Sequence, residues 1–255
     1  MNIVLVSVVR DFAMHAKCIA ENPNCRGCEI VALDNREQND GIGVCYNRFL
    51  ASRPSDENAW YVFCHEDFEL REPLDERLLK ADTNTLWGPI GAATHIRMGV
   101  YHQWKLLGSV EESLKDGTNP HIIGTQVPFG TRIETFDCQC LIVHSSLIHA
   151  KNLRFDEHLT FDLYVEDFSI AAFEQAGILS RILPLKARHW SGGHVQPRYY
   201  QQEAYLNAKY PHSCWTGTSS WILGGNPPLF RRLTVAAKRF LKAISPSSTK
   251  PRTDL

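Results

Sequence analysis

Residues 3–9 read Ile-Val-Leu-Val-Ser-Val-Val, an uninterrupted apolar run that is rich in β-branched side chains. A run without alternation of polar and apolar residues predicts a strand that is buried on both faces, as in a parallel sheet. Two similar runs follow at Cys28–Leu33 and Trp60–Cys64, and helical patterns at Phe12–Glu21 and Gly41–Ala51 lie between the three runs. This alternation of strand and helix predicts an α/β fold with a mostly parallel sheet, right-handed crossovers and flanking helices.

The second half of the chain shows weaker patterns. We expect strands at Leu86–Ala93, Phe136–His144 and Ile178–Leu185, and helices at Asp162–Gly177 and Gln201–Tyr210. The segment 94–134 contains many Gly, Pro, His and Thr residues and few long apolar runs. It is therefore expected to be a long loop, and loops of this length are usually functional or disordered.

Composition limits the class of protein. The chain has 255 residues, of which 44% are hydrophobic and 22% charged, and its formal net charge is -1. These values are typical of a globular protein, and the lack of a basic excess disfavours nucleic-acid binding. No stretch approaches the roughly 20 apolar residues that a membrane-spanning helix needs, and the first residues lack a signal-peptide pattern. The sequence therefore predicts a cytoplasmic protein.

The cysteines leave two alternatives open. Cys25 and Cys28 form a C-x-x-C pair and Cys138 and Cys140 a C-x-C pair, so the four together could bind zinc. Structural zinc sites usually combine two well-spaced pairs, whereas these pairs differ in spacing and lie far apart in the sequence. Free thiols are therefore the expected state.

The C-terminal segment 226–245 has basic residues on one set of helical positions and apolar residues on another. This pattern predicts a basic amphipathic helix. Such a helix could lie on an anionic membrane surface, or it could pack on the domain with its basic face in solvent. The polar tail 246–255 is expected to be disordered.

Polar residues follow each of the three predicted parallel strands. They are Arg10-Asp11, Asp34-Asn35 and His65-Glu66-Asp67. Open parallel sheets bind ligands beyond the carboxyl ends of their strands. No glycine-rich loop follows the first strand, which excludes the common dinucleotide and P-loop motifs. The carboxylates suit a divalent cation that shares the diphosphate of a nucleotide. Alternatively, Glu66 and Asp67 cap the next turn and pair with Arg71.

Two motifs later in the chain also suit chemistry. Glu166 and Asp167 lie at the start of a predicted helix. One of them could act as a general base, or both could simply stabilise the helix N-terminus through its dipole. His189 and His194 flank a Ser-Gly-Gly turn, where glycine lets the backbone approach a ligand closely. Each histidine is either a ligand of the site or a structural residue.

In this order, the motifs resemble those of GT-A-fold glycosyltransferases related to glycosyltransferase family 2. The resemblance rests on the strand Ile3–Val9, Ala32–Asn35 with Tyr46-Asn47 in the next helix, Tyr61–Leu70, Phe155–Asp167 and His189–Gly193. The third piece contains Phe-Cys-His-Glu-Asp, which is similar to the F-x-H-Q-D-V variant of the family's metal motif with Glu in place of Gln. Together the pieces extend over residues 1–200.

The resemblance implies a set of site residues. A nucleotide-sugar would contact Val9, Arg10, Asp34, Asn35, Asn47, His65 and Glu66. Asp67 and His189 would hold Mn²⁺ or Mg²⁺ on the diphosphate, Asp167 or Glu166 would be the general base, and Trp104, Arg132, Asp137 and His194 are acceptor-site candidates. The chain departs from the family in two places. Its metal motif is His-Glu-Asp rather than Asp-x-Asp, and Val165 stands where many relatives carry Asp.

The resemblance also implies a domain arrangement and an activity. A single GT-A-like domain would span 1–225, with a nucleotide-binding half at 1–93 and an acceptor half at 94–225. It would move a sugar, with inversion, from a nucleotide-diphosphate sugar to a hydroxyl of a glycan or lipid-linked acceptor in bacterial surface polysaccharide synthesis. The enzyme would be cytoplasmic, or peripheral on the inner face of the cell membrane. The alternatives are a non-catalytic GT-A-fold protein that binds a glycan or partner, a nucleotidyltransferase, and a zinc-stabilised interaction module.

Overall fold

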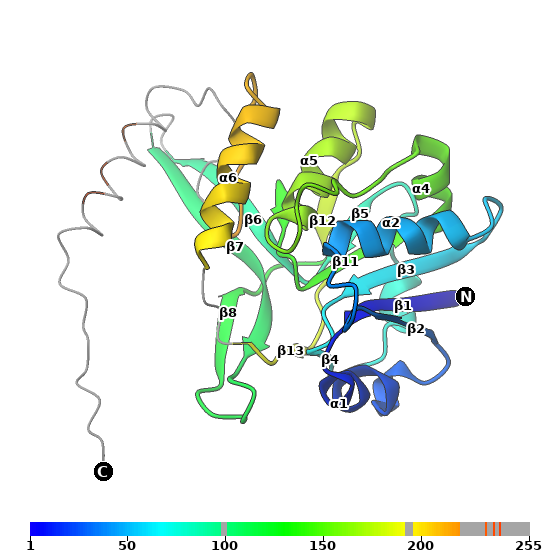
Figure 1. The fold of residues 1–255 in the computed structure, drawn as a ribbon. Coiled ribbons are helices and arrows are strands. Elements are labelled where there is room, and N and C mark those ends of the chain that lie inside the picture. The colour runs from blue at the N-terminus through cyan, green and yellow to red at the C-terminus, as the bar shows by residue number, and fades with distance from the viewer. Residues whose placement is uncertain (98–100, 192–195, 220–232, 234–236, 238–239, 241–255) are drawn as a thin grey trace, which may run out of the picture.

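Three strands from the N-terminal apolar runs form one side of a large sheet (Figure 1). The computed structural model describes residues 1–97, 101–191 and 196–219, together with 233, 237 and 240. Within these residues the sheet has seven strands in the order β2-β1-β3-β11-β5-β12-β9. They are β1 (Asn2–Val9), β2 (Glu29–Asp34), β3 (Ala59–Cys64), β5 (Leu86–Gly88), β9 (Arg132–Ile133), β11 (Cys140–His144) and β12 (Ser180–Ile182). Strand β1 is parallel to both β2 and β3, as the sequence predicts.

The far side of this sheet departs from the mostly parallel arrangement that the sequence predicts. Strand β11 runs antiparallel to both β3 and β5, and β12 runs parallel to β5 but antiparallel to β9. The sheet is mixed because β11, which follows strands of the second sheet, lies between β3 and β5 and runs in the opposite direction to both. The α/β class and the flanking helices are confirmed.

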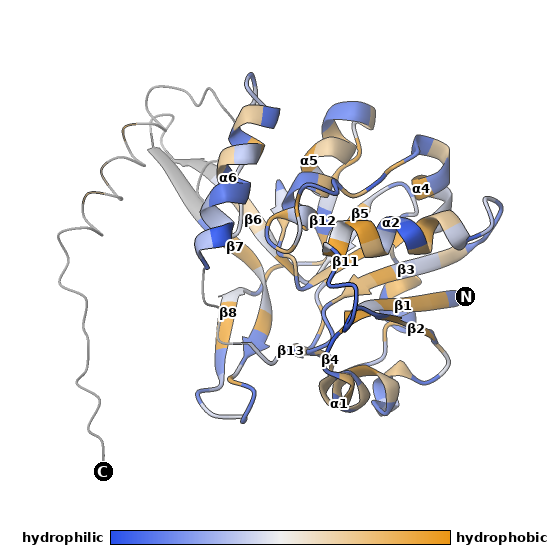
Figure 2. Cartoon of the chain, viewed as in Figure 1, coloured by the Kyte–Doolittle hydropathy of each residue, from blue (hydrophilic) through white to orange (hydrophobic). Residues whose placement is uncertain are grey.

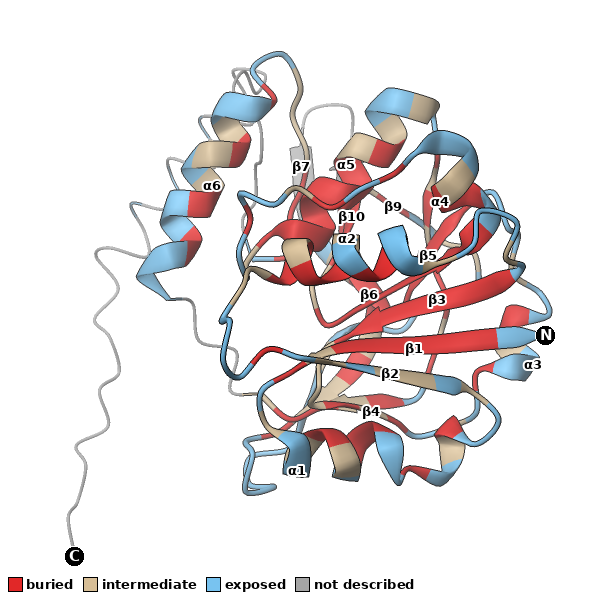
Figure 3. Ribbon diagram, turned by 45° about the vertical axis from the view of Figure 1, so that its right-hand side comes forward, coloured by how far each residue is buried: buried red, intermediate tan, exposed pale blue. Residues whose placement is uncertain are grey.

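Helices cover both faces of the seven-stranded sheet (Figure 1). On one face lie α2 (Ile42–Ser52), α4 (Ser145–Lys151) and α5 (Tyr164–Ala176), and on the other α1 (Phe12–His15), which continues as a π-helical turn over Ala16–Ala20. Val4 and Phe63 pack in the cluster with α2 and α5, whereas Leu5 and Cys64 pack in the cluster beneath the sheet. Strands β1 and β3 are thus buried on both faces (Figure 3), as their uninterrupted apolar sequences predict.

The segment 94–134 forms strands, so its prediction as a loop is wrong. Among the described residues a second sheet has the order β10-β6-β7-β13-β4, and β8 pairs with β7. Its strands are β4 (Phe68–Leu70), β6 (Ile90–Arg97), β7 (Tyr101–Glu112), β8 (His121–Thr125), β10 (Thr135–Phe136) and β13 (Ala187–His189). Two glycines that suggest a loop instead serve an irregularity in the β7–β8 pairing. Gly108 and Gly124 have φ angles of 82° and 80°, and a Cβ on Gly108 would lie 2.0 Å from the Pro89 carbonyl oxygen. Glycine is the residue that tolerates such a bulge.

Connections between the two sheets bring distant segments together. The predicted strand Leu86–Ala93 divides at Pro89 into β5 of the first sheet and β6 of the second. Strand β3 is followed by His65–Asp67 and then by β4 of the second sheet. Because β4 pairs with β13, with Phe68 opposite His189, the end of β13 lies beside the residues that follow β3.

The remaining helices are α3 (Asp75–Leu78), the 3-10 turn Pro23–Cys25 and α6 (Pro197–Lys209). Helix α6 begins four residues before the predicted Gln201, since Pro197 suits a first helical position. It is largely hydrophilic, whereas β1 is hydrophobic along most of its length (Figure 2). Helix α5 ends at Gly177 in the left-handed conformation, as predicted.

The predicted amphipathic helix at 226–245 and the tail 246–255 lie outside the described residues, except for Leu233, Ala237 and Phe240. No described helix is both long and apolar enough to cross a membrane.

Candidate functional site

Two pockets meet at the carboxyl end of β3. The β1-side pocket has a volume of about 330 Å³ and is lined by residues that follow β1, β2 and β3, by the start of α2, and by Phe161 and Arg198. The β13-side pocket has a volume of about 320 Å³ and is lined by the ends of β7 and β13, by residues 137–139 and by the start of α5. His65, Asp67 and Phe161 line both pockets, so ligands in the two pockets would meet there.

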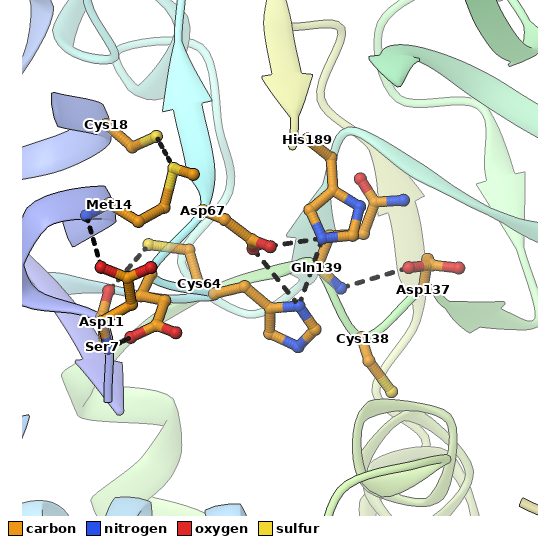
Figure 4. Close-up of polar contacts among 12 residues, drawn as sticks. Ser7, Asp11, Met14, Cys18, Cys64, Asp67, Asp137, Cys138, Gln139 and His189 are labelled. Carbon is orange, nitrogen blue, oxygen red and sulfur yellow. Dashed lines mark hydrogen bonds and ion pairs between the residues drawn. The ribbon is translucent and has the colours of Figure 1, made fainter. Parts of the chain in front are cut away.

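Asp67, His65 and His189 form a cluster between the pockets. Figure 4 shows the carboxylate of Asp67 and the imidazole of His189 facing each other. Nε2 of His189 lies 3.3 Å from Oδ1 of Asp67 and 3.4 Å from Nδ1 of His65. One possible ligand atom from each of the three residues lies within 4.8 Å of the other two. In the described part of the chain, no other set of three such side chains comes this close.

A hydrogen-bond chain orients His65 toward the cluster. The hydroxyl of Tyr164 donates to the carbonyl oxygen of Cys138 at 2.8 Å, so its oxygen can accept from Nε2 of His65 at 3.1 Å. This leaves the lone pair of His65 on Nδ1, which faces Asp67 and His189. Two imidazole nitrogens and a carboxylate oxygen fit a transition-metal dication better than Mg²⁺, which prefers oxygen ligands.

The charges of the cluster are coupled. Burial alone would lower the pKa of His189, but the carboxylates of Asp67 and Glu112 outweigh it and raise that pKa to about 9. Burial and the neighbouring His189 lower the pKa of His65. Burial would raise the pKa of Asp67, yet its contact with His189 lowers it. Without a cation the cluster therefore holds one carboxylate and one imidazolium, and a bound cation would replace the imidazolium proton.

Glu66 holds the loop that follows β1. Its Oε2 atom accepts hydrogen bonds from the backbone N–H groups of Arg10 at 2.6 Å and Asp11 at 2.8 Å. The alternative in which this acidic pair binds Arg71 is wrong, because Nε of Arg71 lies 2.9 Å from Oε1 of Glu69. Glu66 also lines the β1-side pocket, so its carboxylate shapes that pocket through the loop.

The other predicted nucleotide-binding residues divide into two groups. Arg10 and Asn35 line the β1-side pocket, whereas Val9, Asp34 and Asn47 do not. The Asn35 side chain is buried and closes the loop after β2, since its amide donates to the carbonyl oxygen of Asp40 and accepts from the Asp40 N–H, both at 2.9 Å. Val9 is fully buried within the sheet.

Among the predicted nucleotide contacts, Asp34 and Asn47 bond to other parts of the chain. Asp34 is exposed and accepts a hydrogen bond from Nε of Arg36 at 3.0 Å, which lowers the pKa of its carboxyl group. The amide of Asn47 donates to the Phe155 carbonyl oxygen and accepts from the Phe155 N–H, both at 2.9 Å. Asn47 therefore ties α2 to the segment before α5, and its polar atoms are already used.

Glu166 faces the β13-side pocket from the first turn of α5. Its side chain is buried, with Oε1 accepting from the Thr218 hydroxyl at 2.8 Å and Oε2 accepting from the Cys138 thiol at 3.1 Å. Burial and the charge of Asp137 raise the pKa of Glu166 to about 7. A carboxylate with such a pKa suits a general base near neutral pH.

Asp167, the next residue, lines neither pocket. Its carboxylate accepts from Nζ of Lys209 at 2.8 Å and from the Tyr210 hydroxyl at 2.6 Å, so it fastens the end of α6 to α5. Burial raises the pKa of Asp167, and Lys209 opposes this rise. Of the two carboxylates that the sequence offers as the base, the structure therefore brings only Glu166 to a pocket.

The acceptor-site candidates are scattered. Asp137 lines the β13-side pocket. Arg132 lies exposed on β9 with its guanidinium carbon 5.8 Å from the ring centroid of Phe173, and it lines neither pocket. The side chain of Trp104 and the whole of His194 lie outside the described residues.

The four cysteines considered for zinc form no disulfide, and they do not gather into one cluster among the described residues. Cys138 bonds with Glu166, whereas Cys140 and Cys25 pack in the apolar cluster beneath the sheet. Figure 4 shows Cys138 away from Cys64 and Cys18, toward the opposite side of the site.

Sequence reasoning missed three residues of the site. Glu112 ends β7 with its Oε1 atom 3.5 Å from Nδ1 of His189, and it lies in the segment that the sequence predicts as a loop. Phe161 keeps 45% of its surface exposed between the pockets, and the guanidinium carbon of Arg198 lies 4.6 Å from its ring centroid. An aromatic residue in a polar turn is a weak signal that could have drawn attention to Phe161.

Two of the solved structures that resemble this chain are those of glycosyltransferases. The crystal structure of GalNAc-T7 with UDP, GalNAc and Mn²⁺ matches with a TM-score of 0.51 and 9% identity over 81% of this chain and 48% of that one. S. aureus TarS 1-349 in complex with UDP matches with a TM-score of 0.43 and 10% identity over 79% of this chain and 63% of that one. This chain thus spans about half the length of the first and less than two thirds of the second. No protein-family model and no curated protein matches the sequence. The likeness to GalNAc-T7 shows a GT-A fold, as the sequence predicts.

Proposed function

We propose that this chain is an inverting glycosyltransferase that moves a sugar from a nucleotide-diphosphate sugar to an acceptor hydroxyl. The observation that carries the proposal is the cluster of Asp67, His65 and His189 between two pockets, one of which contains the buried carboxylate of Glu166. The GT-A fold supports this class of reaction by analogy. The UDP and Mn²⁺ of the GalNAc-T7 structure support a nucleotide and a metal in the same way.

The nucleotide is assigned to the β1-side pocket. Arg10, which follows β1, and Arg198, which lies in α6, both line this pocket. Guanidinium groups form strong hydrogen bonds with phosphate oxygens. Arg198 is held in place by Asp162, whose Oδ2 atom accepts from its Nε at 2.8 Å. Glu66 keeps the loop that carries Arg10 at the rim of the pocket. The diphosphate of a nucleotide bound there would extend toward the cluster, which both pockets share.

Asp67, His189 and His65 are the proposed ligands of Mn²⁺. His65, predicted from the sequence to contact the nucleotide, is reassigned here because its Nδ1 faces the other two ligand atoms. A bound cation neutralises charge that develops on the leaving diphosphate. The mixed nitrogen and oxygen donors favour Mn²⁺ over Mg²⁺ among the two ions that the sequence suggests.

Glu166 is the proposed general base. As a carboxylate it takes the proton of the acceptor hydroxyl while that oxygen forms a bond to the anomeric carbon of the donor sugar. The bond from this carbon to the diphosphate breaks, and its electron pair leaves with the diphosphate. Attack from the side opposite the leaving group inverts the anomeric carbon. Asp137 lines the same pocket and is proposed to contact hydroxyl groups of the sugar or the acceptor.

The acceptor is proposed to be a glycan or lipid-linked molecule of bacterial surface polysaccharide synthesis, used at the inner face of the membrane. Only the basic pattern of 226–245 supports a membrane location, because such helices bind anionic lipid surfaces. Truncation after residue 225 should abolish sedimentation with anionic liposomes and leave nucleotide binding intact. Equal sedimentation of the truncated chain would disprove this part of the proposal.

The proposal is tested first by ligand binding. Thermal unfolding is followed with UDP, GDP, CDP and TDP and their common sugars, each with and without Mn²⁺. A ligand at about 100 times its dissociation constant stabilises a fold by roughly 2.7 kcal/mol. We expect a Mn²⁺-dependent shift with one nucleotide family. No shift with any nucleotide, for protein shown to be folded, would overturn the proposal and favour a non-catalytic binding protein.

A further inference from the structure

The end of β7 places a carboxylate behind His189. Glu112 pairs in register with His189 of β13 on one side and with His121 of β8 on the other. Its Oε1 atom lies 3.5 Å from Nδ1 of His189, and its Oε2 atom lies 3.7 Å from Nε2 of His121. The Glu112 side chain is largely buried, whereas that of His121 is half exposed. These three side chains form a row across neighbouring strands, from the candidate metal cluster to the surface.

The two ring nitrogens of His189 have different surroundings. Nε2 faces Asp67 and His65, where the cation is proposed to bind. Nδ1 is buried and forms no hydrogen bond of standard geometry within the described residues, and Glu112 supplies a carboxylate oxygen near it. A neutral imidazole has one lone pair and one N–H, so binding a cation through Nε2 leaves the proton on Nδ1. A buried N–H group needs an acceptor, and Glu112 is in place to become one.

We propose that Glu112 is a positioning residue that holds His189 as its Nδ1–H tautomer and directs the Nε2 lone pair toward Asp67. The inference rests on the proposed function, since it takes His189 as a metal ligand. Glu112 acts through His189 and not on the substrate. Histidines that bind metals generally donate their other N–H to a carboxylate or carbonyl, and loss of that partner weakens metal binding about 10–100-fold.

The test is the Mn²⁺ affinity of the full chain, measured by calorimetry without nucleotide. Glu112→Met keeps the length of the side chain but removes the acceptor, and we expect the dissociation constant to rise about 10–100-fold. Glu112→Gln retains an oxygen that can accept from Nδ1, and we expect it to recover most of the affinity. Glu111→Gln is the matched control. Glu111 precedes Glu112 on β7 and pairs with Arg188, so this variant should bind Mn²⁺ as the wild type does.

Each outcome separates this inference from the proposed function. A wild-type chain that binds no Mn²⁺ would overturn the proposed metal site and the inference with it. A Glu112→Met variant that binds Mn²⁺ as tightly as the wild type does would overturn the inference and leave the proposed metal site standing. A Glu112→Gln variant as weak as Glu112→Met would also overturn it, because charge and not the acceptor would then be required. Thermal unfolding of each variant without Mn²⁺ measures any loss of stability separately.

Discussion

Two segments of the site each contain a pair of neighbouring carboxylates, and the members of each pair have different partners. After β3, Asp67 contacts His189 in the cluster, while Glu66 bonds to backbone N–H groups of the loop after β1. At the start of α5, Glu166 faces the β13-side pocket, while Asp167 bonds to the end of α6. In both pairs one carboxylate is available for chemistry and the other fixes the chain around the site.

This division has a geometric cause. Glu66 and Asp67 lie in the turn between β3 and β4, and Glu166 and Asp167 lie in a helix, where successive side chains differ in direction by about 100°. Two adjacent carboxylates therefore rarely face one ligand. The same spacing also lets a single short motif supply both a functional group and the contact that holds its segment in place.

The largest expected effect is that of Asp67→Asn. The amide keeps the size of the side chain but loses the charge that would bind a cation beside His189. We expect kcat/KM for sugar transfer to fall about 10³-fold or more, because a metal contributes several kcal/mol to stabilising developing charge. Mn²⁺ titrations of transfer activity in variant and wild type measure the effect. Undiminished Mn²⁺-dependent transfer by the variant would show that the cation binds elsewhere.

Glu166→Gln should have the next largest effect. The amide cannot take a proton from the acceptor, so we expect kcat to fall about 10²–10³-fold while donor affinity stays unchanged. In the wild type, kcat/KM should rise with pH up to about 7 and then level, because the base acts only when ionised and its pKa is about 7. Pre-steady-state and steady-state rates measured between pH 5 and 9, a range that brackets this pKa, test both expectations. A variant that transfers sugar at the wild-type rate would assign the base to another group.

The fold could be predicted as far as local patterns determine it. The run at residues 3–9 is buried on both faces because its apolar side chains alternate between two clusters. Gly177 ends α5 because it adopts a left-handed conformation. The strands within 94–134 could not be predicted, because Gly108 and the connection between β7 and β8 give the segment the composition of a loop. β6, β7 and β8 pair with their neighbours in the chain, whereas β7 also pairs with the distant β13 and β9 with the distant β12.

The candidate site shows the same limit. Asp67 and His189 could be chosen from the sequence, and the β4–β13 pairing brings them together. The sequence could not decide between Glu166 and Asp167, since the difference depends on where α6 ends. Glu112 could not be chosen at all, because its role follows from strand register in the segment that reads as a loop.

The buried carboxyl group of Glu166 should also make the unfolding free energy of the protein depend on pH. Its carboxyl pKa rises from 4.5 to about 7 on folding, so between these pH values the folded protein keeps a proton that the unfolded chain has lost. Stability contributed by this group therefore falls as pH rises through that window, by about 3 kcal/mol in total. Glu166→Gln lacks this loss and should be more stable than the wild type at pH 8 but not at pH 4. Denaturant unfolding at both pH values measures the difference, and parallel pH profiles for the two proteins would contradict it.

Asp167→Asn should lower the unfolding free energy and leave the rate of sugar transfer unchanged. The variant leaves Lys209 without one of its carboxylates and weakens the buried bond to Tyr210, which we expect to cost about 2 kcal/mol of unfolding free energy. The folded variant should keep its kcat. A double-mutant cycle with Lys209→Met isolates the pair. A large loss of kcat without a loss of stability would place Asp167 among the catalytic groups.

Glu66→Gln should have the smallest effect. The amide oxygen can still accept from the N–H groups of Arg10 and Asp11, so only the charged part of these two hydrogen bonds is lost, at a cost below about 1 kcal/mol. The loop after β1 lines the β1-side pocket, so any change should appear as a higher KM for the donor with kcat unchanged. Glu66→Ala removes the acceptor itself and should raise that KM further. If Glu66→Gln lowered kcat as far as Asp67→Asn does, both carboxylates would take part in catalysis. The distinction between one carboxylate that acts in chemistry and a neighbour that only fixes the chain would then be wrong for Glu66 and Asp67.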